Sequence, residues 1–559
     1  MRAKARRALA LLFSRAGGVS RRPFCLAGLL HSDIIPAQGG QVNKSGRQIA
    51  KAAALVMALF VVSRVLGLVR QMVVGTLFGT SGDLDAYVAA ARIPEMIFLV
   101  VAGGALSSAF IPTFTDHLAR EDHVGAWRLA SAIVNLALIV LTLVAGLMAV
   151  FAPLLTRTVI APGFDLPQQA LTASLLRLML ISSVIFGVSG IVMGALNAYQ
   201  HFLLPALASS VYNLSIIGGA ALLGPRMGVR GMAVGVVVGA VLHLLIQLPG
   251  LLRYGARYVP TLGLDDPDVR EVGRLMAPRV LGTAITQLNF VVNINLASRM
   301  GEGAVSAIYY AWLLLMLPLG VLAQAVGTAA FPTFAAQAAR GERAEMRGAL
   351  TATLRVVFSL CLPATVGLLA LGRPLVELLF ERGAFETSST EAVTWALAFY
   401  ALGLVGHAGL EIIARAFYAL HDTFTPVWVG GLAMALNVVL SLTLPEVFGL
   451  AGLPPYAGLA LANSVATLLE LAALMTLIRR RMDGLEGRRT LLAFVKSGLA
   501  SLAMGAVLVG WRAALPGAGA LAIGSGGVLL GAAVYVAVAL LLRMEELRAV
   551  VNLLRRRAG

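Results

Sequence analysis

Long apolar runs are the feature that most constrains what this chain can fold into. Runs of 18 or more apolar residues recur along its 559 residues, of which 59% are hydrophobic and 13% are charged. About 20 residues, rising about 1.5 Å each, cross the hydrocarbon core of a bilayer, so each run predicts a membrane-spanning helix. Glycine is abundant, and small residues let helices pack closely in lipid. The composition therefore predicts an all-α polytopic membrane protein.

The charge of the chain supports the same class. A formal net charge of +17 would suggest nucleic-acid binding in a soluble protein. The arginines, however, gather in a subset of short loops, as the positive-inside rule describes, so we expect no nucleic-acid partner. Two cysteines and seven scattered histidines form no disulfide framework or metal motif. The sequence contains no nucleophile–base pair and no phosphate-binding loop, so it indicates neither an enzyme nor ATP hydrolysis.

Fourteen helices are expected from the apolar runs, and their even number places both termini on the arginine-rich, cytoplasmic side. They fall near residues 50–78, 93–115, 127–152, 174–199, 203–224, 230–252, 272–299, 305–332, 350–372, 392–419, 426–447, 456–478, 490–512 and 518–543. The expected organisation is a basic disordered cytoplasmic extension (1–48), an N-lobe of six helices (49–252), a cytoplasmic linker (253–271), a C-lobe of six helices (272–480), and two further helices with a basic cytoplasmic tail (481–559).

An internal repeat is the strongest sign of this organisation. GGALSSAFIPTFTDHLARED (103–122) matches AQAVGTAAFPTFAAQAARGE (323–342), and LNAYQHFLLPAL (196–207) matches FYALHDTFTPVW (417–428). The paired prolines have nearly the same offset in sequence, 332 − 112 = 220 for the first pair and 426 − 205 = 221 for the second. An offset of six helices conserves orientation, so the two repeats are parallel. Transporters built from such repeats bind substrate between the halves, which favours a central cavity and alternating access.

Ionisable residues in the stretch from Ser63 to Phe114 are the first candidate site. Such groups at membrane depth cost a few kcal/mol each and persist mainly beside a wet cavity or a partner. Arginine suits phosphate because its guanidinium binds oxygens bidentately and stays charged. The alternatives are that Arg70 reaches the interface or pairs with Asp85, and that Arg92 pairs with Glu95. The predicted substrate-binding residues of the cavity are Arg64, Arg70, Asp85 and Arg92.

Two further groups of polar residues lie in apolar helices. His407, Glu411 and Arg415 share one helix face at a four-residue spacing, which predicts a gate, a coupling element or a structural pair. Neutral oxygens at helical spacing could ligate Na⁺, and interhelical hydrogen bonding explains them at least as well. The candidate Na⁺ ligands are Asn289, Asn293, Asn437, Ser441 and Thr467.

The chain resembles the MurJ (MviN) family of lipid II flippases in the MOP exporter superfamily. The resemblance rests on SRVLG (63–67) with Arg70, on Asp85-Ala86-Tyr87, on Arg92-Ile93-Pro94, and on GALSSAFIP (104–112). It implies two lobes around a cationic cavity and movement of an undecaprenyl-diphosphate-linked peptidoglycan precursor across the bacterial inner membrane, driven by Na⁺ or the membrane potential, with no cofactor. The implied partners are the polyprenyl-diphosphate lipid, the bilayer and, as a candidate, the cell-wall synthesis machinery.

Several cavity positions depart from the family pattern. Phe98 and Gly103 stand where the family places charge on helix 2, Trp312 and Leu313 stand where many members have an arginine, and Gln71 replaces a carboxylate. These departures leave the exact headgroup open. The alternatives are a flippase for another polyprenyl-diphosphate-linked glycan, such as an O-antigen or exopolysaccharide unit, a cation-coupled drug exporter, and a non-transporting cell-wall scaffold.

Overall fold

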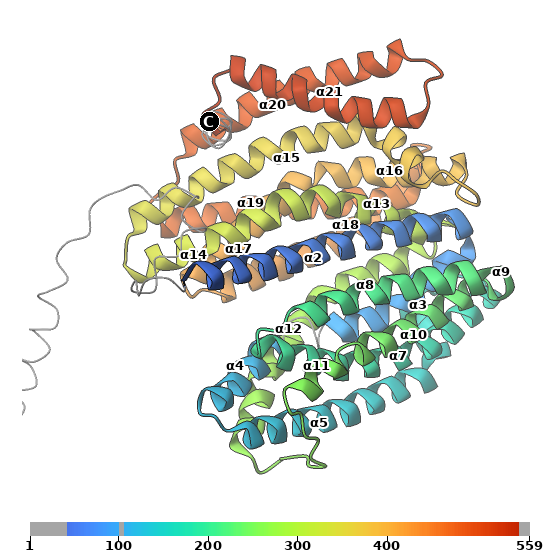
Figure 1. The fold of residues 1–559 in the computed structure, drawn as a ribbon. Coiled ribbons are helices and arrows are strands. Elements are labelled where there is room, and N and C mark those ends of the chain that lie inside the picture. The colour runs from blue at the N-terminus through green and yellow to red at the C-terminus, as the bar shows by residue number, and fades with distance from the viewer. Residues whose placement is uncertain (1–41, 100–105, 547–559) are drawn as a thin grey trace, which may run out of the picture. The chain divides into compact units, whose positions relative to one another are not determined.

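The computed structural model of the protein describes residues 42–99 and 106–546, and every regular element in those ranges is helical (Figure 1). The elements are α2 (Val42–Phe78), α3 (Gly82–Phe98), α4 (Leu106–Ala119), α5 (His123–Val150), α6 (Ala152–Leu155), η3 (Thr156–Ile160), α7 (Leu166–Ala198), α8 (Leu203–Gly218), η4 (Gly219–Leu223), α9 (Gly224–Met227), α10 (Val229–Leu245), α11 (Leu248–Arg253), α12 (Pro267–Ala297), α13 (Ala304–Leu319), η5 (Gly320–Gln324), α14 (Ala325–Ala339), α15 (Arg343–Phe380), α16 (Thr387–Leu402), α17 (Leu404–Ala419), α18 (Phe424–Leu450), α19 (Pro455–Arg481), α20 (Gly487–Ala514) and α21 (Ala520–Leu541), where η marks a π-helical turn. The chain divides into two units, Met1–Ala58 and Leu59–Gly559, and the packing described below lies within the second.

The described helices confirm an all-helical chain with many potential membrane spans. Eleven of them are long and apolar enough to cross a membrane, and the count becomes twelve if α16 and α17, which meet at 45°, form one bent span. Each of the fourteen expected segments overlaps a helix. The expected disordered extension (1–48) overlaps the start of α2, which begins at Val42, and residues 1–41 lie outside the described ranges, as does Gly103.

The start of the second expected helix differs from the prediction. The expected helix starts near residue 93, and this start is wrong because α3 already begins at Gly82. Ser81 caps the helix by accepting a hydrogen bond from the backbone N–H of Leu84, and two acidic residues in the first turn favour a helix N-terminus. Pro94 lies inside α3 without ending it. Asp85 and Arg92 are therefore helical residues.

Turn geometry repeats at the same offsets as the sequence. Glu121 and Gly341 both have positive φ (58° and 72°), and their offset is 341 − 121 = 220. Gln200 and His421 both have φ of 58°, and their offset is 421 − 200 = 221. The hydrogen bonds repeat as well, since Asp122 N donates to His117 O and Glu342 N donates to Gln337 O, each at about 3 Å. The internal repeat is therefore a repeat of backbone structure.

Helix packing repeats in the same way (Figure 1). In the first repeat α3 packs on α7, α4 packs on α5 and α7, and α8 packs on α10. In the second repeat α13 packs on α16, α14 packs on α15 and α17, and α18 packs on α19. The bent pair α16 and α17 thus takes the place of the continuous helix α7. Helices α20 and α21 pack on each other and on α15.

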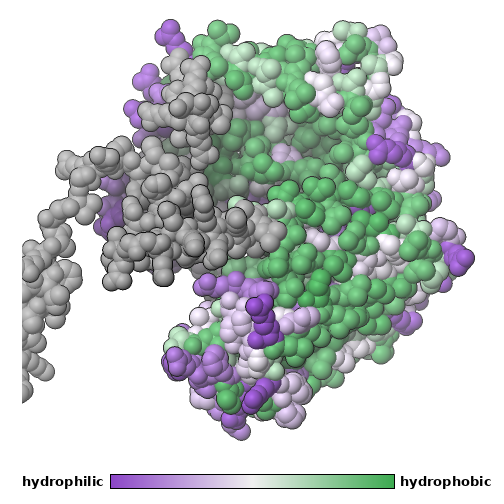
Figure 2. All heavy atoms as spheres, viewed as in Figure 1, coloured by the Kyte–Doolittle hydropathy of each residue, from purple (hydrophilic) through white to green (hydrophobic). Residues whose placement is uncertain are grey.

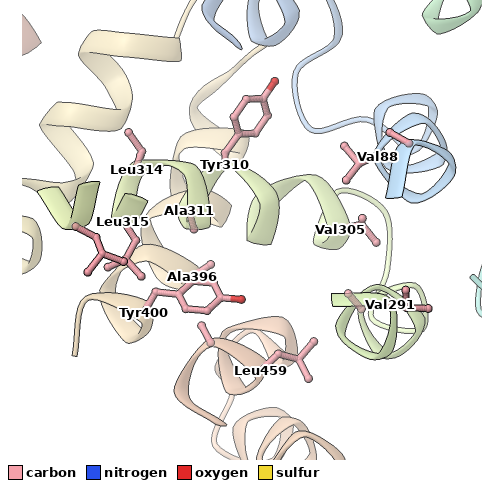
Figure 3. Packing of buried hydrophobic residues seen from close by; sticks show 14 of the residues in the cluster. Val88, Val291, Val305, Tyr310, Ala311, Leu314, Leu315, Ala396, Tyr400 and Leu459 are labelled. Carbon is pink, nitrogen blue, oxygen red and sulfur yellow. The ribbon is translucent and has the colours of Figure 1, made fainter. Parts of the chain in front are cut away.

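The surface and the interior agree with a bilayer environment. Figure 2 shows hydrophobic residues over much of the visible face, and exposed side chains include Leu222, Leu450 and Leu541, at 78%, 91% and 80%. Apolar surface of that extent marks contact with lipid or a partner. Inside, one large cluster of buried residues joins both repeats, and Figure 3 shows α13 crossing it, with Val88 of α3, Val291 of α12 and Leu459 of α19 around it.

Gly79 offers a test of the turn that positions α3. A Cβ at Gly79 would lie 2.3 Å from the carbonyl oxygen of Ala384, and the residue has φ of +59°. We expect Gly79→Ala to destabilise the protein by about 2–4 kcal/mol, as the sum of left-handed strain and a backbone collision. Thermal unfolding of the purified protein measures the loss. Gly452→Ala is the matched control, because Gly452 has φ of +71° and nothing within 4 Å; equal losses in both variants would contradict the collision.

Candidate functional site

A cavity of about 420 Å³ lies among helices of both repeats. Its walls come from α2 and α3, from α7, α8 and α10, and from α12, α13 and α16. The charged and titratable residues in its lining are Arg70, Arg92, Glu95, His243 and the tyrosines Tyr87, Tyr212, Tyr309 and Tyr400. Most of the remaining lining is apolar. The cavity is therefore an apolar chamber with two guanidinium groups and one carboxylate.

The guanidinium of Arg92 makes two hydrogen bonds and stacks on an aromatic ring. Its Nη2 donates to Gln287 Oε1 at 2.9 Å, and its Nη1 donates to Glu95 Oε2 at 3.3 Å. The guanidinium carbon lies 3.9 Å from the centre of the Phe290 ring, a stacking arrangement that favours arginine over lysine. Arg92 thus links α3 to α12 across the cavity. The expected pair with Glu95 is present, together with a second partner on α12.

Arg70 and Arg64 have different surroundings. Arg70 of α2 lines the cavity, next to Gln71, whose Nε2 donates to the Tyr309 hydroxyl at 2.8 Å. Arg64 lies six residues earlier on α2, is exposed, and is absent from the cavity lining. The structure therefore brings together Arg70 and Arg92 and leaves Arg64 apart from them. Its predicted role in substrate binding stays a prediction.

Aromatic rings stand at the cavity positions where the resemblance implied charge. Phe98 lines the cavity and packs on Phe186, with ring centroids 4.9 Å apart. Trp312 lines it on the opposite repeat and packs edge-on against Phe290 at 5.6 Å and Tyr400 at 5.4 Å. Aromatic pairs of this geometry stabilise a wall beyond the area that they bury. The cavity of this chain is therefore more aromatic and less charged than the resemblance implied.

Asp85 lies outside the cavity lining, at the end of the cavity formed by the α2–α3 turn. Its side chain has 0% exposure, and its two oxygens accept hydrogen bonds from the backbone N–H groups of Gly303 and Ser306, both at 2.7 Å. These groups begin α13, and N–H groups in the first turn of a helix have no partner within the helix. Asp85 therefore caps a helix of the second repeat from within the first. Its predicted contact with substrate stays a prediction.

Four more hydrogen bonds close the same end of the cavity. Gly82 N donates to Glu302 Oε1, and Gln168 Nε2 donates to Gly82 O, both at 2.7 Å. The hydroxyls of Thr80 and Ser389 lie 2.8 Å apart, and Ala384 N donates to Thr76 O at 2.8 Å. Backbone groups take part in three of the four bonds. The α2–α3 turn is thus held against α13 and the α15–α16 turn.

The predicted gate residues line a second cavity of about 440 Å³. Glu411 and Arg415 form an ion pair at 2.7 Å along α17. Arg415 also packs on Gly327 of α14, where a Cβ would lie 2.2 Å from Nη1. His407 Nε2 lies 3.0 Å from Asn463 Oδ1, and the His407 ring lies 5.3 Å from that of Trp312. Trp312 and His407 thus stand between the two cavities.

Four of the candidate Na⁺ ligands form two side-chain hydrogen bonds, each within one helix. Asn293 Nδ2 donates to Asn289 Oδ1 at 2.9 Å on α12, and Ser441 Oγ donates to Asn437 Oδ1 at 3.4 Å on α18. Thr467 is buried on α19. Among the described residues, no three His, Cys, Asp or Glu side chains come together at one place. The set offers neutral oxygens without a carboxylate, which is a weak match for a cation.

One titratable residue escaped the sequence analysis. Glu470 is the only acidic residue of α19, in the middle of the apolar stretch LALANSVATLLELAALMTLI (459–478). A lone carboxylate in such a stretch is a functional candidate by default, and this signal was available in the sequence. The tyrosines of the cavity lining carried no such signal, because tyrosine is common at membrane–water interfaces without a role in a cavity.

Comparisons with known proteins agree with these features. The family described as lipid II flippase MurJ matches residues 74–521. The lipid II flippase MurJ of Burkholderia cenocepacia is 33% identical over 447 residues, which cover 77% of this chain and 84% of that protein. A probable lipid II flippase MurJ of Vibrio cholerae is 31% identical, over 77% of this chain and 82% of the relative.

Solved structures give the same picture at the level of the fold. A structure described as lipid II flippase MurJ in an inward closed conformation has a TM-score of 0.74 and 25% identity, and the match covers 88% of this chain and 99% of that one. An inward-facing multidrug resistance MATE family transporter of the MOP superfamily has a TM-score of 0.63 at 18% identity, over 77% of this chain and 98% of that one. The second likeness concerns the fold alone.

Proposed function

Since the chain belongs to the lipid II flippase MurJ family, we propose that it moves lipid II from the inner to the outer leaflet of the bacterial inner membrane, for peptidoglycan synthesis. The observation that carries this proposal is the cavity between the two repeats, with Arg70 and Arg92 in an otherwise aromatic and apolar lining. A diphosphate with attached sugars needs cations for its phosphates and rings or amides for the rest. The protein is a multi-pass transporter rather than a catalyst.

We also propose the arrangement of the helices in the membrane. Of fourteen transmembrane helices, six form an N-lobe (49–252) and six form a C-lobe (272–480). The lobes are joined by a cytoplasmic linker (253–271), and α20 and α21 are the last two helices. The repeated turns and the matching helix pairs support this assignment. The arginine-rich loops support a cytoplasmic position for both termini. The cell-wall synthesis machinery is the partner that a supply of lipid II would serve.

Alternating access supplies the mechanism. The α2–α3 turn and its bonds to α13 close one end of the cavity. The span from Ala304 to Ala339 runs from this end to the opposite turn at Gly341, which is flanked by Arg340 and Arg343. We infer that the closed end faces the outer leaflet, so that the headgroup enters from the cytoplasmic side and binds Arg70 and Arg92. Rocking of the lobes then breaks the bonds of Asp85 with α13 and opens the outer end.

A cation gradient or the membrane potential would drive the cycle. Sodium would have to be held by the amides and hydroxyls of α12, α18 and α19, and Asn293 Oδ1 is a buried oxygen without a partner among the described residues. The amide oxygens of Asn289 and Asn437 already accept hydrogen bonds inside their helices, and none of the candidate groups is a carboxylate. The set therefore fits Na⁺ poorly.

A transport assay tests the proposed function. Purified full-length protein in liposomes should make the headgroup of lipid II accessible on the opposite leaflet, and the gene should restore growth to cells depleted of their own flippase. Polyprenyl-diphosphate lipids carrying an O-antigen or exopolysaccharide unit are the comparison substrates. Equal or faster movement of these lipids, or a lack of complementation by protein that reaches the membrane, would contradict lipid II as the substrate.

A further inference from the structure

Glu470 lies deep in the bilayer region. It stands near the middle of α19, between Pro455 at one end of the helix and Arg481 at the other. With a rise of about 1.5 Å per residue and an offset of 481 − 470 = 11, the carboxylate is about 16 Å from the arginine end of the helix. No ion pair or hydrogen bond to it is found in the described ranges 42–99 and 106–546. An ionised carboxylate in such a place is costly unless it meets water or a cation.

The neighbouring helix α18 leaves room for the carboxylate. A Cβ at Gly430 would lie 3.2 Å from Glu470 Oε1, so the side chain rests against bare backbone. From Phe424 to Pro445, α18 carries no titratable residue. A glycine at this point therefore accommodates the carboxylate without neutralising it.

The other helices packed on α19 supply few charges. Helix α17 packs on α19 and carries Tyr418 and the ion pair of Glu411 with Arg415. Helix α16 carries Glu391, which pairs with Arg373 at 3.7 Å. Helix α13 has no charged residue, and those of α12 lie between residues 268 and 279. Within the described helices, Glu470 thus has no cation of its own.

The helix face of Glu470 also carries Asn463, which contacts a residue of the second cavity. Asn463 and Glu470 are seven residues apart, which is within about 20° of two full turns. Asn463 Oδ1 lies 3.0 Å from His407 Nε2, and His407 lines the second cavity. Glu470 is half-buried, so its carboxylate is partly accessible on the helix face that carries Asn463.

We propose that Glu470 is a proton-carrying carboxylate that couples the movement of the lipid headgroup to a proton gradient, an inference that rests on the proposed function. A hydronium ion on the outer side gives its proton to a carboxylate oxygen, forming an O–H bond, and this bond breaks when the proton passes to water on the cytoplasmic side. No electrons are exchanged. The neutral acid tolerates an apolar environment that the anion does not, so the lobes rock back to the inward-open state with the proton bound. The proton leaves to the cytoplasmic side before the lobes rock outward with the headgroup.

Glu411 is the competing carboxylate on the same lobe. It lies 2.7 Å from the guanidinium of Arg415. Glu411 is therefore part of an ion pair in the second cavity, whereas Glu470 meets no cation among the described helices. The distinction is made by the partners of the two residues and not by their depth.

The coupling is tested with full-length protein in liposomes containing lipid II, with and without a gradient of about one pH unit. The gradient should speed headgroup movement several-fold in the wild type. Glu470→Gln should move lipid II at one rate under both conditions, and Gly430→Ala should weaken the response because a methyl group displaces the carboxylate. Glu446→Gln is the matched control, an exposed glutamate of α18 that should respond like the wild type.

A second measurement separates this inference from the proposed function. Infrared titration of the purified protein should show a protonated carboxyl band that disappears in Glu470→Gln and stays in Glu446→Gln, with no lipid II present. A gradient response that survives in Glu470→Gln, a wild type that responds to a Na⁺ gradient and not to pH, or an unchanged carboxyl band would each overturn the proton role. Absence of lipid II movement in the wild type under every condition would refute the proposed function instead, and the carboxyl band would then decide the protonation of Glu470.

Discussion

Replacing Arg92 with alanine is expected to slow lipid II movement about 10- to 100-fold. The guanidinium is one of two cations in the cavity lining and binds Gln287 while stacking on Phe290. A charge-assisted hydrogen bond contributes about 1.5–3 kcal/mol, and about 1.4 kcal/mol corresponds to a tenfold change. Arg92→Lys keeps the charge and loses the planar fork, so its rate should lie between those of wild type and alanine. The headgroup-accessibility assay measures all three.

Two further arginines make this test specific. Arg157 is exposed on η3, outside the cavity lining, and Arg157→Ala should move lipid II at the wild-type rate. Arg64→Ala distinguishes the sequence-based expectation from the cavity geometry. A rate as low as that of Arg92→Ala would place Arg64 on the substrate path, and a wild-type rate would remove it. Normal transport in Arg92→Ala would contradict the assignment of the headgroup to this cavity.

Replacing Asp85 with alanine is expected to destabilise the protein by about 3 kcal/mol or more. The substitution leaves the N–H groups of Gly303 and Ser306 without acceptors in a site with 0% exposure, and each unsatisfied buried group costs about 1–3 kcal/mol. Asp85→Asn keeps one acceptor and should lose about half as much. Transport should fall in both variants, because the outer end of the cavity no longer closes. Thermal unfolding and the transport assay are measured on the same samples.

Asp83 supplies the control for Asp85. It lies two residues earlier in the first turn of α3 and is exposed, so Asp83→Ala should unfold close to the wild-type temperature. If Asp85 instead contacted the substrate, Asp85→Ala would unfold like the wild type and show weaker dependence of rate on lipid II concentration. That result would restore the role expected from the sequence.

Much of the fold was predictable because it depends on local or periodic properties. Apolar runs long enough to span a bilayer predicted each helix segment, since the backbone must satisfy its own hydrogen bonds in lipid. The offset between Pro112 and Pro332 predicted a parallel repeat, and Glu121 and Gly341 repeat the same turn at the same offset. The second helix begins eleven residues before its expected start (93 − 82), because the Ser81 cap and the acidic first turn begin α3 at Gly82 and Pro94 does not interrupt it.

The sequence by itself determined the class of the protein, its repeat and the residue types available to a cationic cavity, because these follow from hydropathy, spacing and charge. Only the tertiary structure decided what each charge meets. Arg92 has Gln287 as a partner 195 residues away, and Asp85 caps a helix that begins more than 200 residues later. Such partners depend on how α3 packs against α12 and α13, and no local pattern encodes that packing. Glu470 is the opposite case. Its proposed role follows because, within the described helices, folding brings no cation to its carboxylate.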